Sequence, residues 1–136
     1  MNLSKFTDYA FRSLIYLGKN QNRLCTVQEL ANYLNVSENH MKKIIHNLAK
    51  KNYILSIKGR TGGIKLATLP KNINLGDVLI YCEDFSKVVE CQKDNINCIY
   101  NSEKCLIKDI VKASTNKFIE EFKKYTLEDV LILHKY

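Results

Sequence analysis

The sequence lacks the patterns that mark redox enzymes, nucleotide-binding enzymes and membrane proteins. Its 136 residues contain no Cys-x-x-Cys redox pair, no glycine-rich nucleotide-binding motif and no pattern typical of a catalytic triad. No apolar run approaches the roughly 20 residues that a membrane-spanning helix needs, and residues 1–9 lack the long apolar core of a signal peptide. We therefore expect a cytoplasmic protein that is neither an enzyme nor bound to a membrane.

Acidic residues are also scarce: 14 Asp and Glu stand against 21 Lys and Arg, which gives a formal net charge of +7. Such a charge favours an anionic partner, and nucleic acid is the first candidate, although a basic surface can also serve solubility alone. With 46% hydrophobic residues the chain can build a packed core. It contains no internal repeat and no linker long enough to divide it, so we predict one domain over residues 1–136.

Three of the five cysteines lie in one polar stretch, residues 90–105, with six residues between neighbouring members: Cys91, Cys98 and Cys105. In a loop, three thiolates can converge on one point, and this set suits zinc or an iron–sulfur cluster. A single disulfide would leave one thiol over, and three unrelated free thiols are the alternative. Cys25 and Cys82 stand apart beside apolar residues, and we expect both to be buried as small hydrophobic side chains.

The first part of the chain predicts a helix over residues 3–18 and then two short helices joined by a tight turn. A capping box at Thr26 and Glu29 opens the first of the pair, and Ser37 caps the second, which runs to about residue 51. The last helix has an apolar stripe on one side and polar and basic residues on the other. This is the pattern of a helix-turn-helix. Its candidate DNA-contacting residues are Ser37, Asn39, His40, Lys42, Lys43 and His46.

A basic, glycine-rich hairpin is predicted directly after the helix-turn-helix. Residues 53–57 and 64–66 have the pattern of paired strands, and residues 58–63 form the tip. The glycines permit positive φ and close approach to a backbone, while the basic side chains can meet phosphates or a minor groove. Together these elements predict a winged helix over about residues 1–82. The candidate DNA contacts of the wing are Lys58, Arg60 and Thr61.

The rest of the chain predicts a short capped helix over residues 74–81, a long helix over about residues 102–125 and a final short helix to residue 133. The apolar seam of the long helix exceeds what one small winged domain needs, so we expect a partner helix in a homodimer to cover it. The predicted fold class is thus mainly α with a small β-hairpin, a winged helix-turn-helix followed by a long dimerisation helix.

Residues 2–12, 36–45 and 58–66, together with the three-cysteine loop at 90–105, resemble the Rrf-type winged-helix regulators, and within them the branch that senses nitric oxide. The likeness extends from residue 1 to about residue 131. It implies a homodimeric transcriptional repressor that binds palindromic operator DNA. It also implies an iron–sulfur cluster on the three loop cysteines, of the 4Fe-4S rather than the 2Fe-2S type.

The resemblance further implies a fourth ligand. In the branch that regulates cluster assembly, a histidine three residues after the last cysteine completes the set, but this position is Lys108, which cannot serve. In the nitric-oxide branch an aspartate of the first helix takes that place, and Asp8 matches it. Arg12, four residues on, shares its helix face and can orient or neutralise the carboxylate. An Asp8 that reaches the cluster of the other subunit would make the site bridge the dimer.

Loss of that ligand would alter the spacing of the two recognition helices, which must match about one turn of DNA. Nitric oxide is the signal that the resemblance implies. The same fold can instead sense iron–sulfur or iron status or thiol redox state, or hold a structural zinc.

Overall fold

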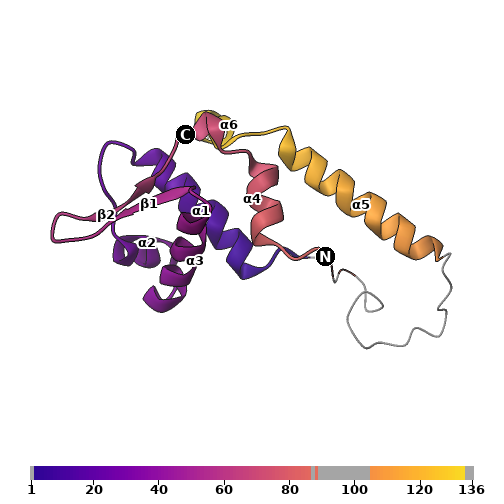
Figure 1. The fold of residues 1–136 in the computed structure, drawn as a ribbon, viewed down its shortest axis with the longest axis horizontal. Helices are drawn as coiled ribbons and strands as arrows, with labels where there is room; N and C mark the ends of the chain where they lie inside the picture. Colours follow the sequence, from indigo (N-terminus) through magenta and orange to yellow (C-terminus); the bar gives the residue numbers. More distant parts are fainter. Residues whose placement is uncertain (1, 87, 89–104, 134–136) are drawn as a thin grey trace.

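Our computed structural model describes residues 2–86, 88 and 105–133 (Figure 1). The elements, in chain order, are α1 (Lys5–Lys19), α2 (Val27–Leu34), α3 (Glu38–Lys50), β1 (Ile54–Ile57), β2 (Gly63–Leu66), the 3-10 helix η1 (Pro70–Asn72), α4 (Leu75–Cys82), α5 (Leu106–Lys123) and α6 (Leu127–Leu133). Their kinds and order confirm the predicted fold class, mainly helical with one antiparallel hairpin. None of the helices in these ranges is long and apolar enough to span a membrane.

Side-chain caps fix where the first three helices begin, because each satisfies a backbone amide that the first turn leaves without a partner. Ser4 Oγ accepts a hydrogen bond from Thr7 N at 3.2 Å, so α1 starts at Lys5. Thr26 and Glu29 form the predicted capping box, with hydrogen bonds of 3.0 and 2.7 Å. Ser37 caps α3 as predicted. The expected helix-turn-helix is thus set by local chemistry.

A third segment pairs with the hairpin, which the sequence does not predict. β1 and β2 are antiparallel, with Ile54 opposite Leu66. Cys25, just before the α2 cap, exchanges two hydrogen bonds with Ile64, Cys25 N to Ile64 O at 2.9 Å and Ile64 N to Cys25 O at 2.7 Å. Cys25 is fully buried, as expected, and this bridge ties the hairpin to the start of the helix-turn-helix.

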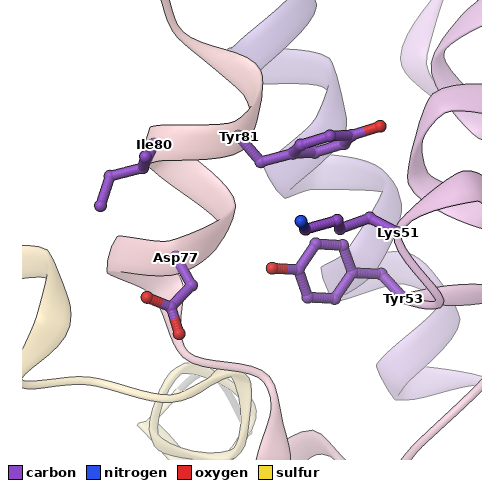
Figure 2. Close-up of a pocket in the computed structure, with 5 residues that line it drawn as sticks. All are labelled: Lys51, Tyr53, Asp77, Ile80 and Tyr81. Atoms are coloured by element: carbon purple, nitrogen blue, oxygen red, sulfur yellow. The ribbon is translucent and has the colours of Figure 1, made fainter.

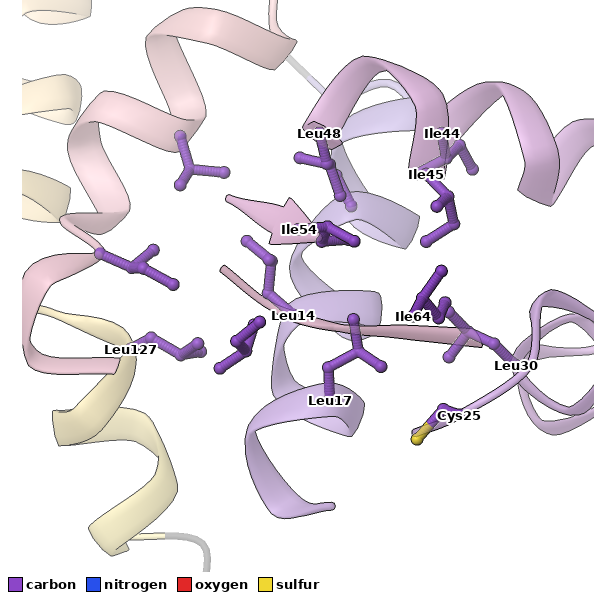
Figure 3. Close-up of a cluster of buried hydrophobic side chains, with 14 of the residues drawn as sticks. Leu14, Leu17, Cys25, Leu30, Ile44, Ile45, Leu48, Ile54, Ile64 and Leu127 are labelled. Atoms are coloured by element: carbon purple, nitrogen blue, oxygen red, sulfur yellow. The ribbon is translucent and has the colours of Figure 1, made fainter. Parts of the chain in front are cut away.

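One apolar cluster joins α1, α3 and the hairpin (Figure 3). The predicted inward stripe of α3 is confirmed, since all four of its members are buried: Met41, Ile44, Ile45 and Leu48. They meet Leu14 of α1 and Ile64 of β2 in the same cluster. Fully burying a side chain of this size contributes roughly 1.5–3 kcal/mol, so the core holds α3 firmly with its polar face outward.

Helix α5 projects away from the body that α1–α3 and the hairpin form (Figure 1). Its C-terminal end is anchored, because Asn74 Nδ2 donates to Lys123 O at 2.8 Å and the Phe122 ring packs on Phe11 with centroids 5.7 Å apart. At its other end Leu106 is 69% exposed and Ile107 60% exposed. Such an apolar surface at the N-terminal end of α5 suits a partner.

The start of α5 differs from the sequence-based expectation. Ser102 was expected to begin this helix and lies outside the described residues, whereas the helix begins at Leu106. Cys105 precedes it in an extended conformation, with φ −89° and ψ 107°, and is its N-cap residue. The last loop cysteine therefore sits at the N-terminal end of α5 rather than within it.

Candidate DNA-binding surface and cysteine site

The outer face of α3 presents most of the predicted DNA-contacting residues to solvent. Exposed residues among them are Ser37, Asn39, Lys42, Lys43 and His46. Lys42 Nζ pairs with Glu38 Oε1 at 3.4 Å, and both side chains are about half exposed or more. A pair of this kind contributes only about 0.3–0.5 kcal/mol, so Lys42 can exchange it for a phosphate at little cost. The Ser37 oxygen accepts the capping hydrogen bond, which leaves its hydrogen free to donate.

His40 differs from its neighbours because it is half-buried. Its ring packs edge-on against Tyr9 of α1, with centroids 5.9 Å apart and an interplanar angle of 89°. Aromatic pairs of this geometry contribute about 0.5–1.5 kcal/mol. Tyr9 directly follows Asp8, the predicted fourth ligand of the cluster. The contact therefore joins this turn of α1 to α3, the predicted recognition helix. The sequence showed both residues on helices but not that they meet.

The wing tip is held by a tight turn around two of its candidate DNA contacts. Gly62 N donates to Gly59 O at 3.1 Å and encloses Arg60 and Thr61, which are both exposed. Gly59 has φ +112°, a backbone conformation that favours glycine. A Cβ on Gly62 would collide with the carbonyl oxygen of Ile57. The predicted glycine requirement is thus confirmed at these two positions.

Asp8 and Arg12 pair on α1 as the sequence predicts. Arg12 Nε donates to Asp8 Oδ1 at 3.1 Å, and the Asp8 side chain is 47% exposed. An exposed pair at this spacing contributes little to stability. The carboxylate therefore remains accessible to a partner molecule, while the guanidinium restricts its orientation.

A second contact fixes the same end of α1 and was not expected. The Glu83 Oε2 atom accepts hydrogen bonds from Ser4 N at 2.9 Å and Ser4 Oγ at 3.1 Å. Glu83 directly follows Cys82, the last residue of α4, so it begins the segment that leads into the three-cysteine loop. The first turn of α1 is thus tied to the entrance of that loop. No local sequence pattern marks such a pair, because its members are far apart in the chain.

Of the three predicted ligand cysteines, Cys105 is half-buried, whereas Cys91 and Cys98 lie outside the described residues. Within residues 2–86, 88 and 105–133, no group of three or more His, Cys, Asp or Glu side chains is placed to hold a metal ion. Cys105 is a free thiol and the N-cap residue of α5, and its side chain makes no capping hydrogen bond.

The other two cysteines are poor ligands for physical reasons. Burial raises the pKa of the Cys25 thiol, which sits in the β-bridge. Burial also raises the pKa of Cys82 to about 11. Both thiols keep their protons near neutral pH, and a metal binds the thiolate. The donor chemistry of the chain therefore fits a set made from Cys91, Cys98 and Cys105.

Comparison with known proteins decides the family. The Rrf2 family model, described as an iron-dependent transcriptional regulator, matches residues 3–132. The chain belongs to the Rrf2 family. As an Rrf2 transcriptional regulator it is a DNA-binding protein and not an enzyme, and its winged helix supplies the elements that such a protein places on DNA.

Relatives of this Rrf2 regulator can be aligned with it over nearly its whole length. It is 35% identical to the HTH-type transcriptional regulator NsrR of Bacillus licheniformis, over 97% of this chain and 93% of that protein. Among solved structures, IscR of T. potens superposes with a TM-score of 0.77 at 20% identity, over 96% of this chain and 86% of that one. CymR (YrzC) of B. subtilis gives 0.74 at 21% identity, over 99% of both chains. These two likenesses support the fold alone.

Proposed function

We propose that this Rrf2 regulator is a homodimeric repressor whose affinity for operator DNA is set by an iron–sulfur cluster and by nitric oxide. The observation that carries the proposal is the 35% identity to NsrR over 97% of the chain. The three-cysteine loop and Asp8 add to it, because both match the nitric-oxide-sensing branch. A regulator that binds chromosomal DNA works in the cytoplasm, so we place it there.

Cys91, Cys98 and Cys105 are the proposed thiolate ligands of a 4Fe-4S cluster, and Asp8 of the partner subunit is the proposed fourth ligand. When bound, the cluster supplies an iron with a weak oxygen ligand, at which nitric oxide can react. The half-exposed Asp8 carboxylate is accessible for this role. Its hydrogen bond from Arg12 at 3.1 Å can orient the carboxylate.

The chain's own contacts offer a route from Asp8 to DNA. The neighbouring Tyr9 ring packs on His40 of α3, so a shift of the first turns of α1 displaces a side chain of the recognition helix. The Ser4–Glu83 hydrogen bonds hold the same turns against the entrance of the cysteine loop. A change in the loop can therefore reach α3 through the Ser4–Glu83 hydrogen bonds and the Tyr9–His40 ring contact, which form a continuous chain of touching groups.

On the DNA side, we propose that α3 enters the major groove and that the wing meets phosphates or the minor groove. Base or near-base contacts are assigned to Asn39, Lys42 and Lys43, and backbone contacts to Ser37, Lys58 and Arg60. Dimerisation through the exposed apolar end of α5, at Leu106 and Ile107, would set the distance between the two α3 helices.

Anaerobic purification followed by visible spectroscopy tests the cluster directly. A brown protein that loses its spectrum and its DNA affinity on titration with nitric oxide is the expected result. Cys105→Ala should abolish stable cluster binding, whereas Cys25→Ala, its matched control, should leave the spectrum intact. A colourless protein that contains zinc, or a full cluster spectrum in Cys98→Ala, would refute the assignment.

A second candidate signal is the iron or iron–sulfur status of the cell, which the description of the family as an iron-dependent transcriptional regulator favours. In that case DNA affinity would follow cluster loading, and stoichiometric nitric oxide would leave the loaded protein and its DNA affinity unchanged. Treating the loaded protein with an iron chelator in one sample and with nitric oxide in another, at equal protein concentration, separates the two signals. Loss of DNA affinity with the chelator but not with nitric oxide would favour the supply sensor.

A further inference from the structure

A cavity between the end of α3 and α4 takes no part in the proposed cluster site or DNA-binding surface (Figure 2). It has a volume of about 520 Å³ and is lined by Lys51, Tyr53, Asp77, Ile80 and Tyr81. Small-molecule pockets span roughly 300–1,000 Å³ and combine apolar walls with a few polar groups. The five side chains come from two segments far apart in sequence, and they supply two aromatic rings, one aliphatic chain and one charge of each sign.

The aromatic wall is fixed by contacts of its own. Tyr81 Oη donates to the Asn47 carbonyl oxygen at 2.8 Å, which anchors its ring against α3. The Tyr53 ring lies edge-on to it, with centroids 6.4 Å apart and an interplanar angle of 61°. Lys51 Nζ lies 5.6 Å from the centroid of the Tyr81 ring, a cation–π contact. These contacts position the aromatic wall in the absence of a ligand.

The two charges of the cavity do not neutralise each other. In the part of the chain that the structure describes, Asp77 forms no ion pair, and its main-chain N–H is the group that the Asn74 cap engages. Burial, and then the charge of Asp77, raise the pKa of Tyr53. The Tyr53 hydroxyl therefore stays protonated and can donate a hydrogen bond. The cavity offers a cationic and donor side at Lys51 and Tyr53, and an anionic side at Asp77.

We propose that this cavity binds a small zwitterion of the amino-acid class with an apolar side chain. Its carboxylate lies against Lys51 and the Tyr53 hydroxyl, and its ammonium group lies against Asp77. The apolar body packs on the Tyr81 ring and Ile80. A simple anion would meet the Asp77 carboxylate and a simple cation would meet the Lys51 ammonium, so only a ligand with both charges satisfies both sides.

The cavity lies where a bound ligand would contact both the end of α3 and α4. Lys51 is the C-cap residue of α3, and Asn52, at φ 61°, makes the turn into β1. Asp77 and Tyr81 belong to α4, which ends next to Glu83 at the entrance of the cysteine loop. A ligand here would bridge the helix-turn-helix and the segment that leads to the loop.

Three probes that share one ring test the charge requirement on the full-length protein: L-phenylalanine, 2-phenylethylamine and 3-phenylpropionate. Backbone amide shifts of the ¹⁵N-labelled chain should saturate with L-phenylalanine, at a dissociation constant of about 1 mM or tighter for a ligand of this size. The amine and the acid should bind at least about tenfold more weakly, because each leaves one charge of the cavity unpaired. Equal binding of all three, or no saturable shift with L-phenylalanine, would overturn the proposal.

Single substitutions of the lining residues test whether L-phenylalanine binds in this cavity. Lys51→Met and Asp77→Asn should each weaken L-phenylalanine binding at least tenfold, and Tyr53→Phe should weaken it a few-fold. Lys50→Met is the matched control, because Lys50 is an exposed lysine next to Lys51 that does not line the cavity. Thermal unfolding of each variant confirms that it is folded. Wild-type affinity in Lys51→Met and Asp77→Asn, or an equal loss in Lys50→Met, would show that the zwitterion does not bind here.

Discussion

Replacing Gly62 by alanine should displace the wing tip and leave the core folded. The new Cβ would collide with the Ile57 carbonyl oxygen and lie 2.9 Å from the carbonyl carbons of Ile57 and Lys58. These are backbone atoms, which cannot swing aside as a flexible side chain can. Relief requires opening the turn, which loses the Gly62–Gly59 hydrogen bond, about 1 kcal/mol, and adds backbone strain of about 1–2 kcal/mol. The buried residues of the hairpin, Ile54 and Ile64, keep their places in the core.

The effect on DNA binding follows from the two residues that the turn presents. If Arg60 meets one phosphate in each protomer, a dimer loses two contacts. At about 0.9 per phosphate, the slope of log affinity against log salt concentration should fall by roughly 2. At about 1 kcal/mol for each exposed ion pair, the loss of two such pairs should lower the affinity roughly thirtyfold.

Fluorescence anisotropy at several salt concentrations measures both quantities, on a duplex that the wild-type protein has selected from a random pool. Arg60→Ala should reproduce the change in slope without moving the backbone. Lys71→Ala, which removes an exposed lysine of η1, should change neither affinity nor slope by a comparable amount. Wild-type affinity and slope in both Gly62→Ala and Arg60→Ala would refute the placement of the wing on DNA.

Three further predictions concern the contacts of α1 and α2. Asp8→Ala should still assemble a coloured cluster on three cysteines, yet bind the selected duplex weakly and respond little to nitric oxide; wild-type behaviour in both assays would remove Asp8 from the coupling. Glu83→Ala should speed hydrogen exchange in the first turn of α1 because it removes the acceptor for Ser4, whereas Glu83→Gln, which keeps an oxygen, should do so less; unchanged exchange would contradict this. Hydrogen bonding to Arg23 lowers the pKa of Glu29 to about 2 from 4.5, so its stabilisation is complete above pH 4.5 and is lost as the pH falls through 2. Glu29→Gln should therefore reduce the free energy of unfolding in urea by about 1–2 kcal/mol at pH 7, and a difference that persists unchanged at pH 2 would contradict the assignment.

Much of the fold could be predicted from the sequence because its signals are local. The capping box at Thr26 and Glu29 lies within four consecutive residues, and the buried stripe of α3 repeats at helical spacing. The candidate DNA-binding residues of α3 follow from the second of these features, since a buried stripe leaves the opposite face to solvent. The cysteine spacing likewise needs no tertiary information to suggest a ligand set, although only Cys105 falls within the described residues.

The contacts that the sequence missed all join residues far apart in the chain. Nothing near Cys25 indicates its hydrogen bonds to Ile64, and nothing near Glu83 indicates its bonds to Ser4. His40 fitted the pattern of a solvent-facing residue, but the crossing of α3 over α1 brings its ring to Tyr9. Helix crossing is decided by how whole side-chain surfaces interlock, and no local pattern encodes it.

The sequence alone therefore determined the order of the elements, the outward chemistry of α3 and the wing, and membership of a recognisable family, because hydrophobic period, caps and turn residues act within a few positions. The tertiary structure decided which of those residues are mechanically connected. It packed the Tyr9 ring, next to Asp8, on His40 of α3, and it bonded the start of α1 to Glu83 at the entrance of the cysteine loop. It also assembled the cavity lined by Lys51 and Tyr81 from separate segments. Such connections depend on the packing of the entire core, in which every buried side chain constrains where the others can lie.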